Sequence, residues 1–296
     1  MNRREAGFLL LTSHLGNPDR KPLSTAQLRT LAQRMQVVEK PSDDRELDVQ
    51  DIVRLGYGRD SAEHIHALLS EEDQLHYYLQ QGKKRSCIPV TRVSEDYPHI
   101  LRQRLGLDSP GCLWCKGDQT LLNSAAISLV GSRDLLEPNR QFARAVGIHA
   151  ARQGLTLVSG NARGADRTAQ EACLEAGGRV ISIVADDLSR QPLLENVLYV
   201  SEDGYTEPFS AQRAISRNWC IHALGQVVFV AQSSLGRGGT WDGTVKNLHK
   251  GISPVLCFRD GSEASRELEQ LGAYLIGQAQ LSDFEPLSRD ENLFDR

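Results

Sequence analysis

Residues 127–133 read ISLVGSR, and residues 155–166 read LTLVSGNARGAD. In both stretches a short run rich in Val, Ile and Leu ends in a glycine turn. A helical pattern follows each turn, over residues 138–153 and 165–176. Short apolar strands that alternate with helices are typical of a parallel sheet covered on both faces. The two stretches therefore predict two consecutive strand–turn–helix units.

The same alternation continues toward the C-terminus. Further strands are predicted at residues 180–184, 227–231 and 254–258, and further helices near 214–224 and 242–250. This order predicts an α/β fold with an extended Rossmann-like, doubly wound and mostly parallel sheet over residues 85–283. A short strand is also expected at 88–90.

The N-terminal part, residues 1–84, is predicted to be a small helical domain. Ser24 and Thr25 are suited to cap a helix, and a second apolar pattern runs from Ile52 to Leu69. The turn at residues 55–58 reads LGYG, so a helix-hairpin-helix element that presents backbone N–H groups to a phosphate is one interpretation. A helical packing module is the interpretation that we favour. Residues 284–296 are acidic and polar and are predicted to form a flexible tail.

Composition limits the classes of function. The net charge of −4 argues against a wholly basic nucleic-acid coat, so an anion site must be local. No apolar stretch approaches the ~20 residues that span a bilayer, and we expect a cytoplasmic protein with no membrane partner. Cys112 and Cys115 have a C-x-x-C spacing, but no second close pair completes a zinc site, and a buried strand is the better interpretation. We predict no metal and no cofactor.

Three polar or glycine-rich loops follow predicted strands, and each carries an arginine. In a doubly wound sheet, ligands bind outside the carboxyl ends of the strands. Glycine lets backbone N–H groups approach a phosphate, and guanidinium groups match phosphate oxygens. A helix that opens near Arg217 and Asn218 is expected at the same edge. The predicted phosphate-binding residues are Gly131, Ser132, Arg133, Ser159, Gly160, Arg163, Gly164, Asp166, Arg217, Asn218, Arg237, Gly238, Gly239 and Thr240.

Several enzyme classes are disfavoured by missing motifs. The sequence has no G-x-x-x-x-G-K-[ST] loop, and its first strand-to-helix turn lacks G-x-G-x-x-G. A motor ATPase and a dehydrogenase are therefore not expected, and we assign no catalytic residue. Asp166 is interpreted as a cap or brace of the following helix rather than as a base. Trp219 is expected in the core, whereas Trp241, beside the third loop, is a candidate for stacking on a base.

With these motifs in family order, the sequence resembles the DprA/Smf (DNA-processing) family from about residue 50 to residue 260. The landmarks are Tyr97-Pro98, residues 113–117, 130–133 and 158–166, Ser201-Glu202, Arg217-Asn218 and the glycine loop at 236–240. The resemblance implies binding of single-stranded DNA in a positive pocket, dimerisation, and loading of a RecA-type recombinase during natural transformation. It also implies that Arg133 is the pocket arginine of the Gly-Ser-Arg motif.

The sequence departs from the family pattern at two places. Ala214 and Ile215 stand where the family has Phe-Pro, so the aromatic that would stack a base is missing. The loop at residues 237–243, RGGTWDG, is closer to that of lysine-decarboxylase-like nucleotide-binding proteins. A nucleoside-monophosphate phosphoribohydrolase is therefore the alternative, although Asp242 is too near this loop, and Glu263 too far, for the expected acidic residue. A defence-associated protein whose partner contacts the N-terminal helices is a third hypothesis.

Overall fold

The computed structural model describes residues 1–37, 47–202 and 204–283. Within them the protein contains one nine-stranded sheet of order β1-β2-β6-β5-β4-β3-β7-β8-β9. The strands β3 to β9 run parallel to one another, whereas β2 pairs antiparallel with both β6 and the edge strand β1. The bounds are β1 Ile88–Thr91, β2 Cys112–Lys116, β3 Ala126–Val130, β4 Thr156–Ser159, β5 Arg179–Ile183, β6 Val197–Ser201, β7 Val228–Val230, β8 Val255–Phe258 and β9 Tyr274–Ile276. The predicted mostly parallel, doubly wound sheet is confirmed.

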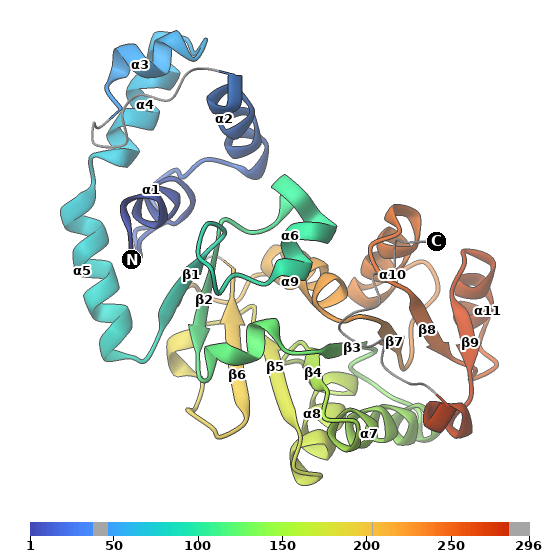
Figure 1. The fold of residues 1–296 in the computed structure, drawn as a ribbon. Helices are drawn as coiled ribbons and strands as arrows, with labels where there is room; N and C mark the ends of the chain where they lie inside the picture. The colour runs from blue at the N-terminus through green and yellow to red at the C-terminus, as the bar shows by residue number, and fades with distance from the viewer. Residues whose placement is uncertain (38–46, 203, 284–296) are drawn as a thin grey trace.

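Helices cover both faces of this sheet (Figure 1). One face carries α7 (Glu137–Arg152) and α8 (Ala165–Glu175), and the other carries α6 (His99–Leu105), α9 (Ala211–Leu224) and α10 (Gly239–Lys250). The last helix, α11 (Glu263–Gln270), joins β8 to β9. Short 3-10 turns lie at η1 (Gly106–Asp108), η2 (Gln119–Asn123), η3 (Leu188–Arg190) and η4 (Gln278–Asp283).

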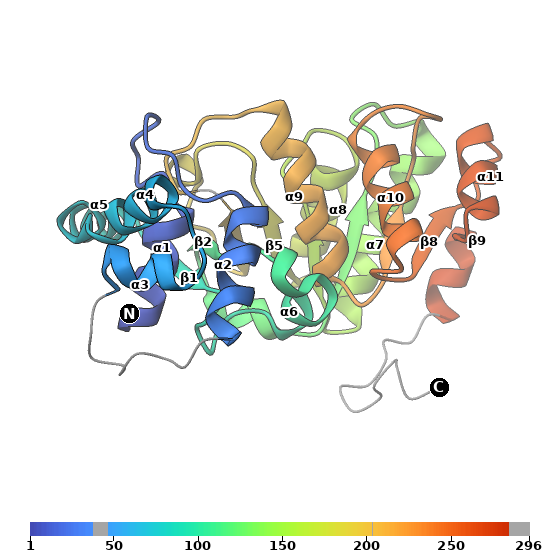
Figure 2. The same cartoon turned by 90° about the horizontal axis from the view of Figure 1, so that it is seen from above.

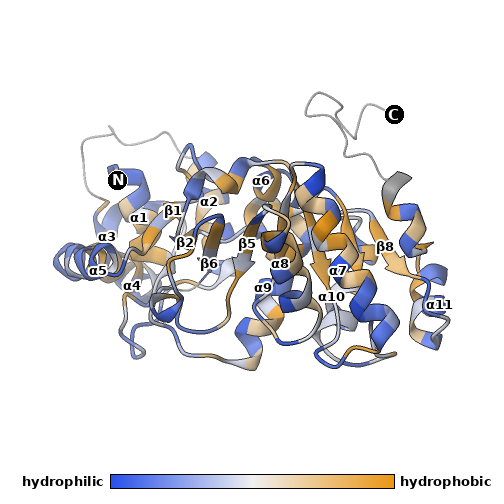
Figure 3. Ribbon diagram, turned by 90° about the horizontal axis from the view of Figure 1, so that it is seen from below, coloured by the Kyte–Doolittle hydropathy of each residue, from blue (hydrophilic) through white to orange (hydrophobic). Residues whose placement is uncertain are grey.

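Two buried clusters lie on the opposite faces of the sheet because successive strand residues point to opposite sides. In β3, Ile127 and Leu129 belong to the cluster with Phe142 of α7, whereas Val130 belongs to the cluster with Ile221 of α9. Figure 3 shows this as apolar strands between helices whose outer surfaces are hydrophilic. Burial on both faces explains why the strands read as nearly continuous apolar runs.

The N-terminal helices pack in two groups. The helices α1 (Arg3–Thr12) and α5 (Glu72–Lys84) pack against the sheet edge, where Leu9 and Tyr78 share a buried cluster with Trp114 of β2. The helices α2 (Thr25–Val37), α3 (Val49–Arg54) and α4 (Arg59–Leu69) enclose a separate small cluster. The predicted domain boundary at residue 84 coincides with the end of α5, and independent folding of residues 1–84 stays a prediction.

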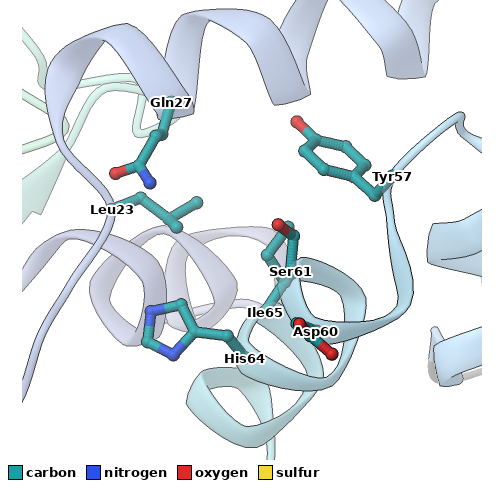
Figure 4. A pocket seen from close by; sticks show the side chains of 7 residues that line it. All are labelled: Leu23, Gln27, Tyr57, Asp60, Ser61, His64 and Ile65. Carbon is teal, nitrogen blue, oxygen red and sulfur yellow. The ribbon is translucent and has the colours of Figure 1, made fainter.

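A hollow of about 230 Å³ lies within the second group, between α2 and α4 (Figure 4). Its walls are Leu23, Gln27, Tyr57, Asp60, Ser61, His64 and Ile65. None of these residues belongs to the three glycine loops that follow the strands, although Tyr57 lies in the LGYG turn at residues 55–58. The hollow is thus a feature of the helical part and not of the sheet edge.

Three other predictions concern the state of the cysteines, the membrane-spanning helices and the C-terminal tail. All six cysteines are buried free thiols, and Cys112 and Cys115 both lie inside β2, as the buried-strand interpretation holds. No helix among the described residues combines the length and apolar character needed to cross a bilayer. The predicted tail at residues 284–296 falls outside the described residues.

Candidate functional site

The loops after β3, β4 and β7 meet at the carboxyl edge of the sheet. The backbone N–H of Ala165 donates to the carbonyl of Ser132 over 3.1 Å, and the hydroxyl of Thr240 donates to the carbonyl of Gly131 over 3.0 Å. A methyl group on Gly164 would lie 2.4 Å from the carbonyl oxygens of Ser132 and Arg133. The three predicted loops are therefore neighbours in space, at the position where β4 and β7 flank β3.

In the loop after β4, residues 159–166, backbone groups form hydrogen bonds with side chains of the loop and of α8. We call it the closed loop. The carboxylate of Asp166 accepts the backbone N–H of Ala162 at 3.2 Å. The side-chain amide of Gln170 donates to the hydroxyl of Ser159 at 2.7 Å and also to the carbonyl of Gly160. The N-cap of α8 is Gly164, so Asp166 braces the loop and does not cap the helix.

Arg217 lies beneath the closed loop, and its side chain is only 10% exposed. Its Nη1 donates to the carbonyl of Ile183 over 2.8 Å, and its Nη2 lies 4.0 Å from Oδ2 of Asp166. Gly160 permits this approach, because a methyl group there would lie 2.8 Å from Cζ of Arg217. Burial raises the pKa of Asp166 to about 6, although the positive charge of Arg217 opposes the shift. The guanidinium of Arg217 thus faces the interior of the molecule.

Asn218, the next residue of α9, holds the start of α10. Its side-chain amide donates to the carbonyl of Gly239 over 2.9 Å. Gly243 of α10 lies against the same region, since a methyl group there would meet Cβ of Asn218 at 3.4 Å and Nε2 of His222 at 3.3 Å. Asn218 therefore fixes the position of the loop that connects β7 to α10.

The loop after β7, residues 234–240, is exposed up to Gly238 and half-buried at Gly239 and Thr240, and we call it the open loop. It turns through Gly236 and Gly238, with φ of 67° and 88°, values that favour glycine. Gly238 is the N-cap of α10 and provides no side-chain hydrogen bond to it. The first N–H groups of a helix have no partner within the helix, so this N-terminus can accept an external anion.

The arginines at the edge differ in what they contact. Arg163 pairs with Asp134 at 2.5 Å, and both side chains are exposed. Arg133 and Arg237 are exposed as well. Across residues 1–37, 47–202 and 204–283, no carboxylate forms an ion pair with either of them. Two of the four predicted arginines are therefore free to bind an anion.

The two tryptophans of this region are half-buried. Trp219 packs on the apolar cluster of its face, as expected, and Lys246 lies 3.9 Å from its ring centroid. Trp241 packs on the same cluster. Its ring is thus partly used in packing, which leaves it a weaker stacking platform than its position in the sequence indicates.

Two polar residues that support the loops were not predicted from the sequence. Gln170 lies on the buried face of α8 beside Ala169 and Cys173, and a polar residue on an otherwise apolar helical face is the signal that would reveal it. Asn139 is buried near the start of α7, and its amide donates to the carbonyl of Ala231 and to Asp260, both at 2.8 Å. Among the described residues, no group of three His, Cys, Asp or Glu side chains is placed to hold a metal ion.

Comparisons with known proteins identify the family of the chain. Residues 89–281 match the family of the DNA recombination-mediator protein A. The chain is 31% identical to Protein Smf of Escherichia coli over 263 residues, which are 78% of this chain and 69% of the relative. It is 27% identical to the DNA processing protein DprA of Streptococcus pneumoniae, over 82% of this chain and 89% of the relative.

Solved structures show the same fold. DprA of Streptococcus pneumoniae superposes with a TM-score of 0.74 at 24% identity, over 96% of this chain and 99% of that one. DprA of Helicobacter pylori, whose structure was described for its single-stranded-DNA binding mode, gives a TM-score of 0.55 at 22% identity, over 67% of this chain and 97% of that one. The family match includes all three loops of the site. The chain belongs to the DNA recombination-mediator protein A family.

Proposed function

We propose that this protein binds single-stranded DNA at the carboxyl edge of its sheet and acts as a recombination mediator rather than as a catalyst. The observation that carries the proposal is a pair of exposed arginines, Arg133 and Arg237, which form no ion pair with any described residue and lie beside the glycine-capped start of α10. These groups offer guanidinium donors and a helix N-terminus to a phosphate.

The remaining predicted residues have a positioning role in this proposal. Gly131, Ser132 and Thr240 join the loops to one another, while Asp166 and Arg217 fix the closed loop from inside. Asn218 holds the first turn of α10. A binding surface whose backbone is fixed in advance loses less entropy when the ligand docks.

Three carboxylates at this edge are engaged with protein groups, whereas Asp242, in the first turn of α10, is exposed. Asp134 pairs with Arg163, Asp166 accepts a backbone N–H, and Glu202 accepts the hydroxyl of Ser216 at 3.0 Å. Their charges are partly offset by these contacts, so repulsion of a phosphate chain is reduced. The local surface can be cationic although the whole chain has a net charge of −4.

The wider role follows from the family. We propose a homodimer in the cytoplasm that delivers single-stranded DNA to a RecA-type recombinase, with a helical unit at residues 1–84 beside the sheet domain at 85–283. The support is the family match and the similarity to proteins named DprA and Smf.

The direct test compares the affinities of the full-length protein for single-stranded DNA, duplex DNA and nucleoside monophosphates at two salt concentrations. We expect the tightest binding to single-stranded DNA, with a steep loss at the higher salt concentration. Arg133→Ala should weaken binding to a similar degree for all sequences, because a phosphate contact is independent of the base. Wild-type affinity in this variant at low salt would refute the assignment of the pocket.

The same protein should be incubated with nucleoside monophosphates and assayed for free base. The start of α10 at Gly239, after Gly238 and near Asp242, is the feature that a phosphoribohydrolase would also use. Release of base at a rate abolished by Arg237→Ala would favour that alternative over a purely DNA-binding role.

A further inference from the structure

Phe209 is exposed at the same edge of the sheet as the three loops. It lies between β6 and α9, and 58% of the residue is accessible to solvent. The segments that precede α9 and α10 lie along one edge of the molecule (Figure 2). A large aromatic side chain exposed beside a binding surface is a candidate for ligand contact.

The backbone on both sides of Phe209 is held in place. Nη1 of Arg213 donates to the carbonyls of Glu207 and Pro208, over 3.0 and 2.8 Å, and to the carbonyl of Ala185 over 2.8 Å. Its Nη2 donates to the hydroxyl of Ser201 at the end of β6. On the other side, the hydroxyl of Ser210 caps α9 by accepting the N–H of Arg213. The exposure of Phe209 is therefore built into a fixed segment.

A local structural role does not account for the ring. Phe209 precedes the N-cap, a position from which an apolar side chain often packs on the fourth residue of the helix. That residue is Ala214, whose single methyl group is too small to cover a phenyl ring, in agreement with the exposure of Phe209. The fold thus leaves most of the aromatic surface uncovered.

A further apolar side chain is exposed on the helix that follows Phe209. Ile215 of α9 is 58% exposed. Arg213 and Arg217 of α9 bond to the carbonyls of Ala185 and Ile183, so this helix begins over the end of β5. The apolar surface therefore continues the edge on which Arg133 and the open loop lie.

We propose that Phe209 stacks on an unpaired base of a strand whose phosphates contact Arg133 and the open loop. This inference rests on the proposed function, since it assigns the base-contacting residue of that same site. Unpaired nucleic acid fits both surfaces because it combines an anionic backbone with exposed aromatic faces, whereas a duplex hides its bases. A protein partner is the other occupant to be tested.

The test measures the affinity of the full-length protein for an oligo(dT) and for an abasic oligonucleotide of the same length. Phe209→Ala should weaken binding of oligo(dT) by roughly 5- to 150-fold, the range observed for loss of one stacked base, and should leave binding of the abasic strand unchanged. Phe209→Trp should retain affinity, and its fluorescence should be quenched on binding. Tyr274→Ala is the matched control, because Tyr274 is similarly exposed at 67% but begins β9, the edge strand at the far end of the sheet from β6 and β5.

Three results would overturn the inference. Equal affinity of Phe209→Ala and the wild type for oligo(dT) would show that no base stacks there, while leaving the proposed function intact. An equal loss with both strands would indicate a general disturbance of the site. Failure of the wild type to bind either strand, with Phe209→Ala losing only capture of a second protein, would refute DNA binding itself and assign the ring to a protein partner.

Discussion

The closed loop and the open loop are both glycine-rich, both follow a parallel strand and both precede a helix, yet their donors are used differently. In the closed loop, Asp166 and Gln170 bond the backbone, and Arg217 is buried beneath it. In the open loop, Arg237 is exposed and the helix N-cap is a bare glycine. A glycine turn with an arginine therefore indicates an anion site only where neighbouring carboxylates leave its donors free.

The largest difference between the closed and open loops is expected when one arginine is removed from each loop region and the free energies of unfolding are compared. Arg217→Ala should lower the free energy of unfolding by about 3–5 kcal/mol, because it leaves the charge of Asp166 buried and unpaired. Arg237→Ala should change it by less than about 0.5 kcal/mol, because the side chain is exposed and forms no ion pair within the part of the chain that the structure describes. Urea denaturation measures both values. Similar losses in the two variants would contradict the assignment of scaffold and contact surface.

A matched pair of glycines tests the packing of the two loops. Gly164→Ala combines a φ of 90° with a methyl group 2.4 Å from two carbonyl oxygens, and we expect a loss of about 2–5 kcal/mol. Gly236→Ala has a φ of 67° but no atom within 4 Å of the added methyl group, so only the backbone cost of about 1–2 kcal/mol should remain. Thermal or urea unfolding gives the comparison, and an equal cost at both positions would show that the closed loop is not tightly packed.

The pH dependence of stability should report the burial of Asp166. Its pKa is about 6 in the folded protein against 3.8 for the free side chain, so the folded state binds the proton more tightly. This stabilisation is present below about pH 4 and is lost as the pH rises through 6. Relative to Asp166→Asn, the wild type should lose up to about 3 kcal/mol of unfolding free energy between pH 4 and pH 7. Parallel stability curves for the two proteins would argue against a buried carboxylate.

Much of the fold can be predicted from the sequence because β3, β4, β5 and β7 are buried on both faces, and β8 is buried on one face and half-buried on the other. The strand β6 was not predicted, since only the short turn η3 separates it from β5 where a crossover helix is expected. The strand β9 has three residues, and Tyr274 in it is exposed, so it carries no apolar run. A strand is harder to predict from the sequence where it is partly exposed, as in β9, or where no regular helix connects it to the preceding strand, as in β6.

The candidate site could be located from the sequence, but the roles of its residues could not be separated. The loops carry local signals, namely glycines and arginines after apolar strands. The inward orientation of Arg217 depends on Ile183 and Asp166, which reach it from other elements. The free state of Arg133 and Arg237 likewise depends on the absence of a carboxylate partner among the described residues, a tertiary property with no local sequence pattern.

The salt dependence of single-stranded-DNA binding measures whether Arg133 and Arg237 neutralise phosphates. Each neutralised phosphate contributes about 0.7 to the slope of log K against log salt concentration for a single strand. The double variant Arg133→Ala/Arg237→Ala should therefore lower the magnitude of the slope by about 1.4 while the protein stays folded. An unchanged slope in this variant would contradict the account, because phosphates would then be neutralised elsewhere.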